Sequence, residues 1–217
     1  MISLFIDSSR RELSVALINN DKLISSVNVE SYSKHSNFLM NTIKSILKDN
    51  TISINDVDNF VVLNGPGSFT GVRVGITISK TLAWVLSKKI YTLSTLEAQK
   101  LSVKDDVVIS VIKDKNDYSY VGIYEEDTKY EDYISIDDEK LNLKNKNITI
   151  VSMEKSIFTD NLVEKLSNCN NVNISIIDSY NYINVINYAL SKPSINPHSA
   201  KPIYLKKIDA EKKNNAN

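Results

Sequence analysis

Glycine is confined almost entirely to one short stretch of this chain. Of the five glycines, four fall within NGPGSFTGVRVG at residues 64–75, and the fifth is Gly122. The stretch follows the apolar run FVVL at 60–63 and precedes a longer segment rich in apolar residues. It therefore predicts a loop between a buried strand and a helix. Glycine readily adopts backbone conformations that other residues disfavour, and a tight loop is where such conformations occur.

Known phosphate-binding patterns match this loop poorly. In a Walker loop, the two conserved glycines would fall on Val74 and Ser79. Gly65-Pro66-Gly67 begins a dinucleotide fingerprint, but Thr70 stands at its third glycine position. Two interpretations remain: an anion site at a helix N-terminus, or a structural loop that leads tightly into the helix. The residues alone favour the structural loop.

The following helix carries a row of small residues. Gly71, Gly75, Ser79, Ala83 and Ser87 recur every four positions, a spacing that lets another element approach closely. Apolar residues flank this row on both sides, so the helix is apolar on more than one face. Two interpretations are equally supported: a helix buried within its own domain, or one that is also buried against a partner.

Composition narrows the class of protein. Basic and acidic residues balance at 26 each, which argues against a protein that grips nucleic acid alone through a broad basic face. A single cysteine, Cys169, allows no internal disulfide and fits a reducing cytoplasm. The N-terminus lacks the pattern of a secretory signal, no apolar run is long enough to span a membrane, and no metal-binding motif is present.

The order of predicted elements indicates an α/β fold. Short strands are expected at 2–6, 12–18 and 22–30 as an antiparallel meander, followed by a helix from Ser36, a strand at 60–63 and the helix after the glycine loop. This order is that of ribonuclease-H-like and actin-like ATPase domains. We expect a first lobe over 1–100, a smaller α/β lobe over 101–205, and a disordered tail over 206–217.

The second lobe is expected to repeat strands and helices with less regularity. Its predicted strands lie at 107–112, 118–124, 148–151 and 172–177, and its predicted helices at 154–168 and 181–191. The acidic stretch at 125–140 is interpreted as a solvated loop rather than a cation site. No internal repeat is legible in the residues themselves.

One turn is a weak candidate for nucleotide binding. Asp7, Ser8 and Ser9 follow the first predicted strand, where actin-like ATPases place a metal-binding Asp and a glycine-rich hydroxyl turn. This turn has no glycine, and two arginines follow it. A hydrogen-bonded turn is therefore the favoured interpretation.

Several motifs resemble one family. The stretch NGPGSFTGVRVGITISKTLAW strongly resembles the signature of the TsaB family, also called YeaZ. The opening LFIDSS, the KHSNFLM segment and the closing KPIYLKK resemble that family's first strand, first helix entry and final motif. The resemblance covers most of residues 1–95 and the C-terminus, and it is weak over 100–200.

The resemblance implies a fold of two actin-like lobes, the second reduced, and an accessory role in a cytoplasmic complex. The family pairs with the TsaD subunit, which transfers a threonylcarbamoyl group to N6 of adenosine 37 in tRNA, and the ATPase TsaE joins the pair. The protein would have no catalytic residues of its own, would form homodimers when alone, and would meet tRNA only through the complex. No cofactor or metal is expected, and weak ATP or ADP binding in the complex is left open.

Pairing in the family uses the first two helices, here about 34–48 and 72–88. On that basis we expect an interface of His35, Leu39, Ile43, Leu47, Val72, Gly75, Ile76, Ser79, Leu82 and Ala83. A structural loop would set the second helix in place, formed by Gly65, Pro66, Gly67, Ser68, Phe69, Thr70, Gly71 and Arg73. Substitution of Gly75 or Ser79 by Leu is then expected to abolish pairing and leave the monomer folded.

Two rival functions come from other classes. An ATP-binding enzyme of the same fold, with its own hydrolysis, would need an intact phosphate turn. A metalloprotease would need a cluster of metal ligands, and the sequence shows none that is recognisable.

Overall fold

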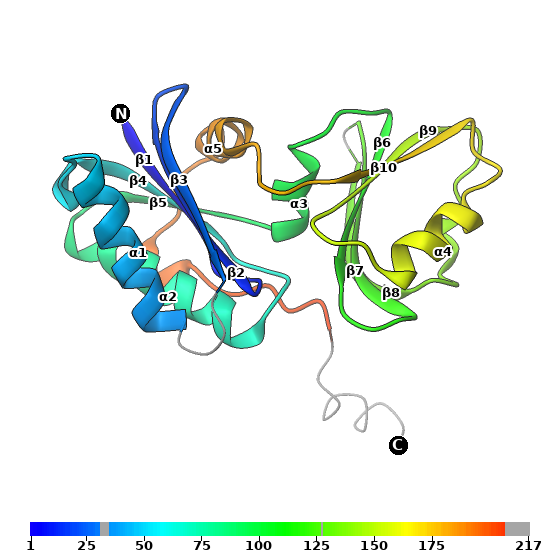
Figure 1. The fold of residues 1–217 in the computed structure, drawn as a ribbon, viewed down its shortest axis with the longest axis horizontal. Helices are drawn as coiled ribbons and strands as arrows, with labels where there is room; N and C mark the ends of the chain where they lie inside the picture. The colour runs from blue at the N-terminus through cyan, green and yellow to red at the C-terminus, as the bar shows by residue number, and fades with distance from the viewer. Residues whose placement is uncertain (31–34, 127, 207–217) are drawn as a thin grey trace, which may run out of the picture. The chain divides into compact units, whose positions relative to one another are not determined.

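The chain forms two α/β units that each contain one five-stranded mixed sheet (Figure 1). The computed structural model describes residues 1–30, 35–126 and 128–206, and of residues 35–37 only the backbone. The first unit comprises Met1–Leu101 together with Tyr180–Ile203, and the second comprises Ser102–Ser179 with the segment from Tyr204. The division after Leu101 lies one residue beyond the predicted end of the first lobe.

The first sheet has the strand order β3-β2-β1-β4-β5. β1 pairs antiparallel with β2, and β2 with β3, whereas β4 is parallel to β1 and β5 is parallel to β4. The predicted meander at the start of the chain is confirmed. The strands are β1 (Ile2–Asp7), β2 (Glu12–Asn19), β3 (Lys22–Glu30), β4 (Val57–Leu63) and β5 (Lys89–Leu93).

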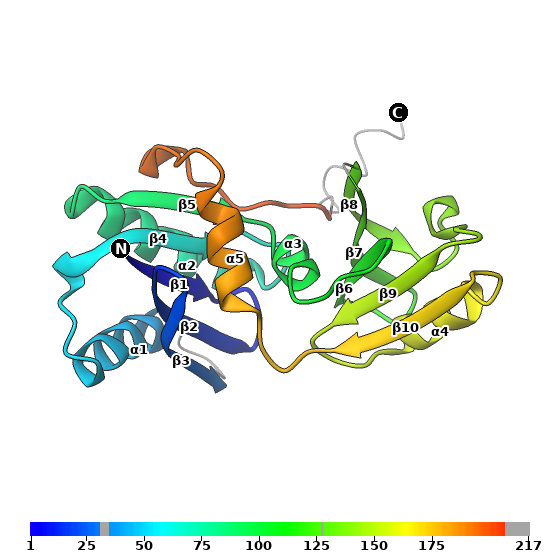
Figure 2. The same ribbon diagram turned by 90° about the horizontal axis from the view of Figure 1, so that it is seen from above.

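Helices cover both faces of this sheet (Figure 2). Alternation along β1 sends Leu4 and Ile6 into the core beneath α1 (His35–Asp49) and α2 (Phe69–Val85). Phe5 points to the other face, where its ring lies 5.3 Å from that of Tyr182 in α5. The remaining helical segments of the unit are α3 (Thr95–Lys100), α5 (Tyr182–Leu190) and the short 3-10 turns η1 (Ile54–Asp56) and η3 (Pro197–Ser199).

One predicted boundary is wrong. Residues 180–203 were expected in the second lobe, but they belong to the first unit. The reason is packing: the rings of Tyr180 and Tyr182 meet Phe5 in β1, and Ile195 forms a bridge with Ile90 in β5. These contacts join residues far apart in the chain, which sequence periodicity does not report. The predicted tail at 206–217 lies outside the described residues apart from Lys206.

The second sheet has the order β10-β9-β6-β7-β8, and it follows the same plan as the first. Here β6, β7 and β8 form the antiparallel meander, and β9 and β10 continue in parallel from β6. The elements are β6 (Val107–Lys113), β7 (Tyr118–Glu125), β8 (Thr128–Ser135), η2 (Glu139–Leu141), β9 (Asn147–Ser152), α4 (Ile157–Lys165) and β10 (Asn171–Ile176).

The acidic stretch at 125–140 is not a loop throughout, which corrects the prediction. It contains β8, which pairs with β7 and is an edge strand of the second sheet. Ile134 and Tyr130 pack into the core of this unit, and Tyr133 packs against Tyr120. Charged residues on an edge strand discourage pairing with other chains, and here they also hide the strand pattern in the sequence.

Candidate functional site

The glycine loop packs against the turn that follows β1. Gly65 has φ of +99°, a region that side chains rarely adopt. At Gly67 a Cβ atom would overlap the backbone oxygen of Ser9, and the amide of Ser68 donates to that same oxygen at 2.6 Å. The Ser68 hydroxyl then caps α2 by accepting from the Gly71 amide. The backbone of Ser9 thus lies directly against the loop at Gly67 and Ser68.

The carboxylate of Asp7 is bonded within the protein through both of its oxygens. It is completely buried, and one oxygen accepts from the Ser9 amide at 2.7 Å. The other oxygen accepts from the Tyr180 hydroxyl at 2.8 Å and lies 3.7 Å from Nε of Arg10. Burial, followed by the nearby Asp7 charge, raises the pKa of Tyr180 well above its ordinary value, so this hydroxyl stays a donor.

Both hydroxyls of the turn are also bonded. Ser8 donates to the carbonyl of Gly71 at 2.8 Å, and Ser9 accepts from Thr95 at 3.3 Å. A phosphate or a metal ion at this turn would have to displace these bonds and the Tyr180 hydroxyl. In this structure these bonds fasten the start of α2 to the end of β1.

The residues predicted to bind a partner face inward, which corrects the prediction. Almost all of those on α1 and α2 are buried, and the exception, Leu82, packs partly buried against the same core. The buried residues are Leu39, Ile43, Leu47, Val72, Gly75, Ile76, Ser79 and Ala83. The side chain of His35, the first residue of α1, lies outside the described part of the chain.

The physical reason is that apolar periodicity marks the side of a helix that packs on its own sheet. The first four members of the small-residue row, Gly71, Gly75, Ser79 and Ala83, are buried and serve the same packing. A Cβ atom at Gly75 would come closer than 3.0 Å to Oγ of Ser8, so glycine is what lets α2 lie against the turn after β1. Substitution of Gly75 or Ser79 by Leu is then expected to disrupt the fold, not pairing alone.

The opposite side of α2 exposes large apolar side chains. Phe69, Trp84 and Val85 are 53%, 61% and 65% exposed, and Phe38 on neighbouring α1 is 43% exposed. Between the two ends of α2 lies a shallow, mainly apolar pocket of about 340 Å³. We call this surface the outer face; it comprises Phe38 and, on α2, Phe69, Thr70, Arg73, Val74, Thr77, Ile78, Trp84 and Val85.

Three members of the outer face, Phe69, Thr70 and Arg73, were predicted as loop residues. Phe69 and Arg73 begin α2, and the Arg73 guanidinium lies 3.6 Å above the centre of the Phe69 ring. This stacking holds a charge flat over an aromatic surface that is largely exposed. The signal that could have located the outer face was the excess of apolar residues on α2 beyond those needed for one buried side.

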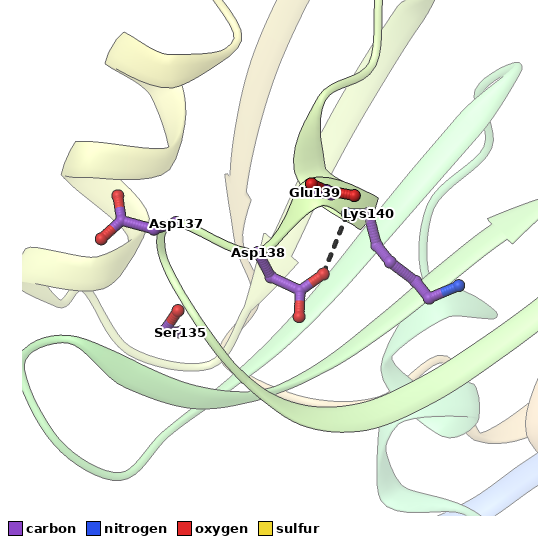
Figure 3. A pocket seen from close by; sticks show the side chains of 5 residues that line it. All are labelled: Ser135, Asp137, Asp138, Glu139 and Lys140. Atoms are coloured by element: carbon purple, nitrogen blue, oxygen red, sulfur yellow. Dashed lines mark hydrogen bonds between the residues drawn. The ribbon is translucent and has the colours of Figure 1, made fainter.

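The described residues of the acidic segment are not gathered as metal ligands. A hollow of about 660 Å³ is lined by Ser135, Asp137, Asp138, Glu139 and Lys140 (Figure 3). The labelled carboxylates point in different directions, and Asp138 caps η2 by accepting from the Lys140 amide. Within residues 1–30, 35–126 and 128–206 no group of three or more His, Cys, Asp or Glu side chains is placed to hold a metal ion.

The two sheets define the class of protein. Both units carry an antiparallel meander whose first strand continues into parallel strands, the arrangement of ribonuclease-H-like and actin-like ATPase domains. The predicted fold class is confirmed. In the described part of the chain, no helix is both long enough and apolar enough to cross a membrane.

Comparison with known proteins gives the family. A family model described as TsaD, tRNA N6-adenosine threonylcarbamoyltransferase, matches residues 28–137. The tRNA threonylcarbamoyladenosine biosynthesis protein TsaB of Bacillus subtilis is 34% identical over 127 residues, which are 58% of this chain and 56% of that protein. The tRNA N6-adenosine threonylcarbamoyltransferase of Ehrlichia canis is 30% identical over 48% of this chain and 34% of that protein. The matched region thus spans only about half the length of this TsaB relative.

Solved structures agree on the fold. YeaZ from Pseudomonas aeruginosa superposes with a TM-score of 0.77 at 19% identity, covering 94% of this chain and 99% of that one. The chain belongs to the TsaB (YeaZ) family, and the TsaD family model matches its residues 28–137.

Proposed function

We propose that this protein is a non-catalytic subunit needed to form N6-threonylcarbamoyladenosine at position 37 of tRNA in the cytoplasm. It would act by pairing with a TsaD-type transferase subunit through the outer face of α1 and α2. The observation that carries the proposal is the exposure of Phe69, Trp84 and Val85 on a single helix, outside the residues that it buries in its own core.

Large exposed apolar side chains gathered on one helix are costly in water and are typical of a surface that another protein covers. Burial of a side chain such as Trp84 or Val85 contributes about 1.5–3 kcal/mol, so a few of them can dominate an interface. Arg73 adds a charged and planar group at the pocket, and arginine is enriched among residues that anchor interfaces.

The family relationship favours a related partner. The transferase of Ehrlichia canis is similar to 48% of the length of this chain. The TsaD model matches residues 28–137, which include α1 and α2. Two related lobes can join through equivalent helices about a pseudo-two-fold axis. By the same geometry two copies of this chain would pair when the transferase is absent, and a TsaE-type ATPase would join the heterodimer.

Catalysis would then lie on the transferase. In this chain the Asp7 carboxylate and the hydroxyls of Ser8 and Ser9 are all bonded internally. The rival function, an ATP-binding enzyme with its own hydrolysis, would need those groups free to hold a metal ion and phosphates. No contact in the described part of the chain favours that rival.

The proposal is tested by light-scattering chromatography of the protein mixed with its cognate TsaD-type subunit. We expect a one-to-one complex with the unaltered chain and a loss of it with Val85→Asp, because a carboxylate would be buried in an apolar interface. A cost of about 2–3 kcal/mol, typical of a central interface residue, weakens binding by roughly 30- to 150-fold.

The matched control is Ile174→Asp, which places the same charge at an exposed apolar position of β10 in the second unit, 42% exposed. Both variants should keep the thermal transition of the unaltered chain, since neither side chain belongs to a buried core. Equal pairing by the two variants would refute the assignment of the outer face, and no complex with the unaltered chain would refute the proposed function.

A further inference from the structure

The two helices that carry the outer face are basic, although the formal net charge of the whole chain is zero. The charged residues of α2 are Arg73 and Lys80, and this helix contains no carboxylate. α1 adds Lys44 and Lys48 against a single acidic residue, Asp49. Together the two helices therefore carry four lysine or arginine side chains and one acidic side chain.

Both cations of α2 lie on the side that faces away from the core. Arg73 lines the apolar pocket of the outer face, with its guanidinium over the Phe69 ring. Lys80 follows Arg73 by seven residues, which is about two helical turns, so it lies on the same side of α2. Neither residue is among those that α2 buries. Helical spacing thus places two positive charges among the exposed apolar side chains.

The elements packed against α2 do not cancel this charge. Those elements are α1, β1, β4, β5 and η3. In β1 the carboxylate of Asp7 is completely buried, and in β4 that of Asp58 lies 3.9 Å from Lys88. β5 adds a further cation, Lys89, and η3 has no acidic residue. Asp49 of α1 is the one acidic side chain already counted, so among the described residues the two helices keep an excess of positive charge.

A partner that covers the outer face must therefore accept cations as well as apolar side chains. Covering the pocket removes water from Arg73, and a charge that loses water without gaining a partner costs several kcal/mol. A guanidinium is best satisfied by a carboxylate, which it binds through two parallel hydrogen bonds. Tight binding at this face thus requires carboxylates on the surface that meets it.

We propose that the outer face takes a partner whose facing helices are acidic, with carboxylates opposite Arg73 and Lys80. The proposal rests on the proposed function, which gives this face to a TsaD-type subunit, and it adds the charge that this subunit must present. A second copy of the chain does not meet the requirement, because it brings the same two cations to the interface. Charge therefore favours the heterodimer over the homodimer, and repulsion between identical faces gives the specificity.

The first experiment measures both kinds of pairing by light-scattering chromatography at two salt concentrations. Raising the salt from about 0.1 M to about 1 M shortens the Debye length from about 10 Å to about 3 Å. We expect pairing with the TsaD-type subunit to weaken, because attraction is screened, and self-pairing to strengthen, because repulsion is screened. Heterodimer affinity that does not fall, or self-pairing that falls, would overturn the proposal.

The second experiment reverses the two charges. At about 0.1 M salt, Arg73→Glu/Lys80→Glu should weaken pairing with the TsaD-type subunit by about 10- to 100-fold, because like charges then face each other. The matched control is Lys104→Glu/Lys144→Glu, which makes the same change at exposed positions of the second unit. Equal weakening by the two double variants would show a general effect of net charge and would overturn the proposal.

A third experiment needs no transferase, so it separates failure of the proposal from failure of the proposed function. Unaltered chain is mixed with the Arg73→Glu/Lys80→Glu variant, and the mixed pair should form in preference to either homodimer, because opposite charges then meet. A mixed pair that is absent, or that forms only in random proportion, overturns the proposal even where the transferase binds. Binding to phosphatidylglycerol vesicles without any protein pairing would assign the face to a lipid surface and would overturn it as well.

Discussion

Gly75 lies where α2 packs against the turn after β1, and the clash that a side chain would cause there can be measured directly. A Cβ atom would come closer than 3.0 Å to Oγ of Ser8 and within 3.6 Å of Val62, an ordinary contact. The Ser8 hydroxyl cannot move freely, because it is buried and donates to the Gly71 carbonyl at 2.8 Å. The conflict is therefore between one added methyl group and one hydroxyl.

The expected magnitude follows from opposing contributions. Replacing glycine by alanine inside a helix stabilises it by about 1 kcal/mol. Overpacking costs about 1–3 kcal/mol, and displacement of the Ser8 hydrogen bond costs about another 1 kcal/mol. We expect Gly75→Ala to lower the free energy of unfolding by about 1–3 kcal/mol. Ser8→Ala alone should cost about 1 kcal/mol, because it removes that bond.

The double variant Gly75→Ala/Ser8→Ala tests whether the added methyl group and the Ser8 hydroxyl clash. Removal of the Ser8 hydroxyl makes room for the new methyl group, so Gly75→Ala/Ser8→Ala should be more stable than the sum of the single effects by about 1–3 kcal/mol. Urea unfolding followed by fluorescence suits the test, because the single tryptophan, Trp84, lies in α2 of the same unit. Ser9→Ala with Gly75→Ala serves as the control pair. Additive effects in the Ser8 cycle would refute the clash.

Four further outcomes are expected from the same unfolding measurement. Tyr180→Phe should lose about 1–3 kcal/mol, because it removes a donor from the buried Asp7 carboxylate; an unchanged midpoint would contradict this. The pKa of Tyr180 is raised in the folded state, so the contribution of its hydroxyl to the free energy of unfolding is complete below its ordinary pKa of 10 and is lost as pH rises above that value. The decline of stability at high pH should therefore be shallower in Tyr180→Phe. Ser79→Ala should leave stability unchanged or raise it by up to about 1 kcal/mol, because this buried hydroxyl has no hydrogen-bond partner among the described residues; a clear loss would contradict it. Gly65→Ala should cost about 1–2 kcal/mol, because φ there is +99° and a Cβ atom would lie 3.1 Å from the Ile203 oxygen; a neutral effect would contradict it.

Much of the fold was predictable because local patterns and tertiary structure agree there. The alternation along residues 12–18 and the turn at 19–21 predicted a strand and a tight link, and both are present in the β1–β2–β3 meander. The strand, glycine loop and helix at 57–85 were predictable for the same reason, because glycine at Gly65 marks a backbone conformation that few other residues adopt.

Other features were hidden because they depend on contacts between distant residues. The return of α5 to the first sheet depends on Phe5 meeting Tyr180 and Tyr182. The repeated topology of the two sheets leaves no legible repeat in the residues, because many different apolar sequences can satisfy one pattern of burial. β8 was missed because an edge strand tolerates charge on its exposed positions.

The sequence by itself determined the class of fold, the family resemblance and the pair of helices proposed to meet a partner. Only the tertiary structure decided which side of those helices is available. Periodicity shows that α2 is apolar on more than one side, but the sheet beneath it selects the side that carries Gly75 and Ile76 for the core. Phe69, Trp84 and Val85 remain on the surface because the remaining side of α2 has no sheet to cover it.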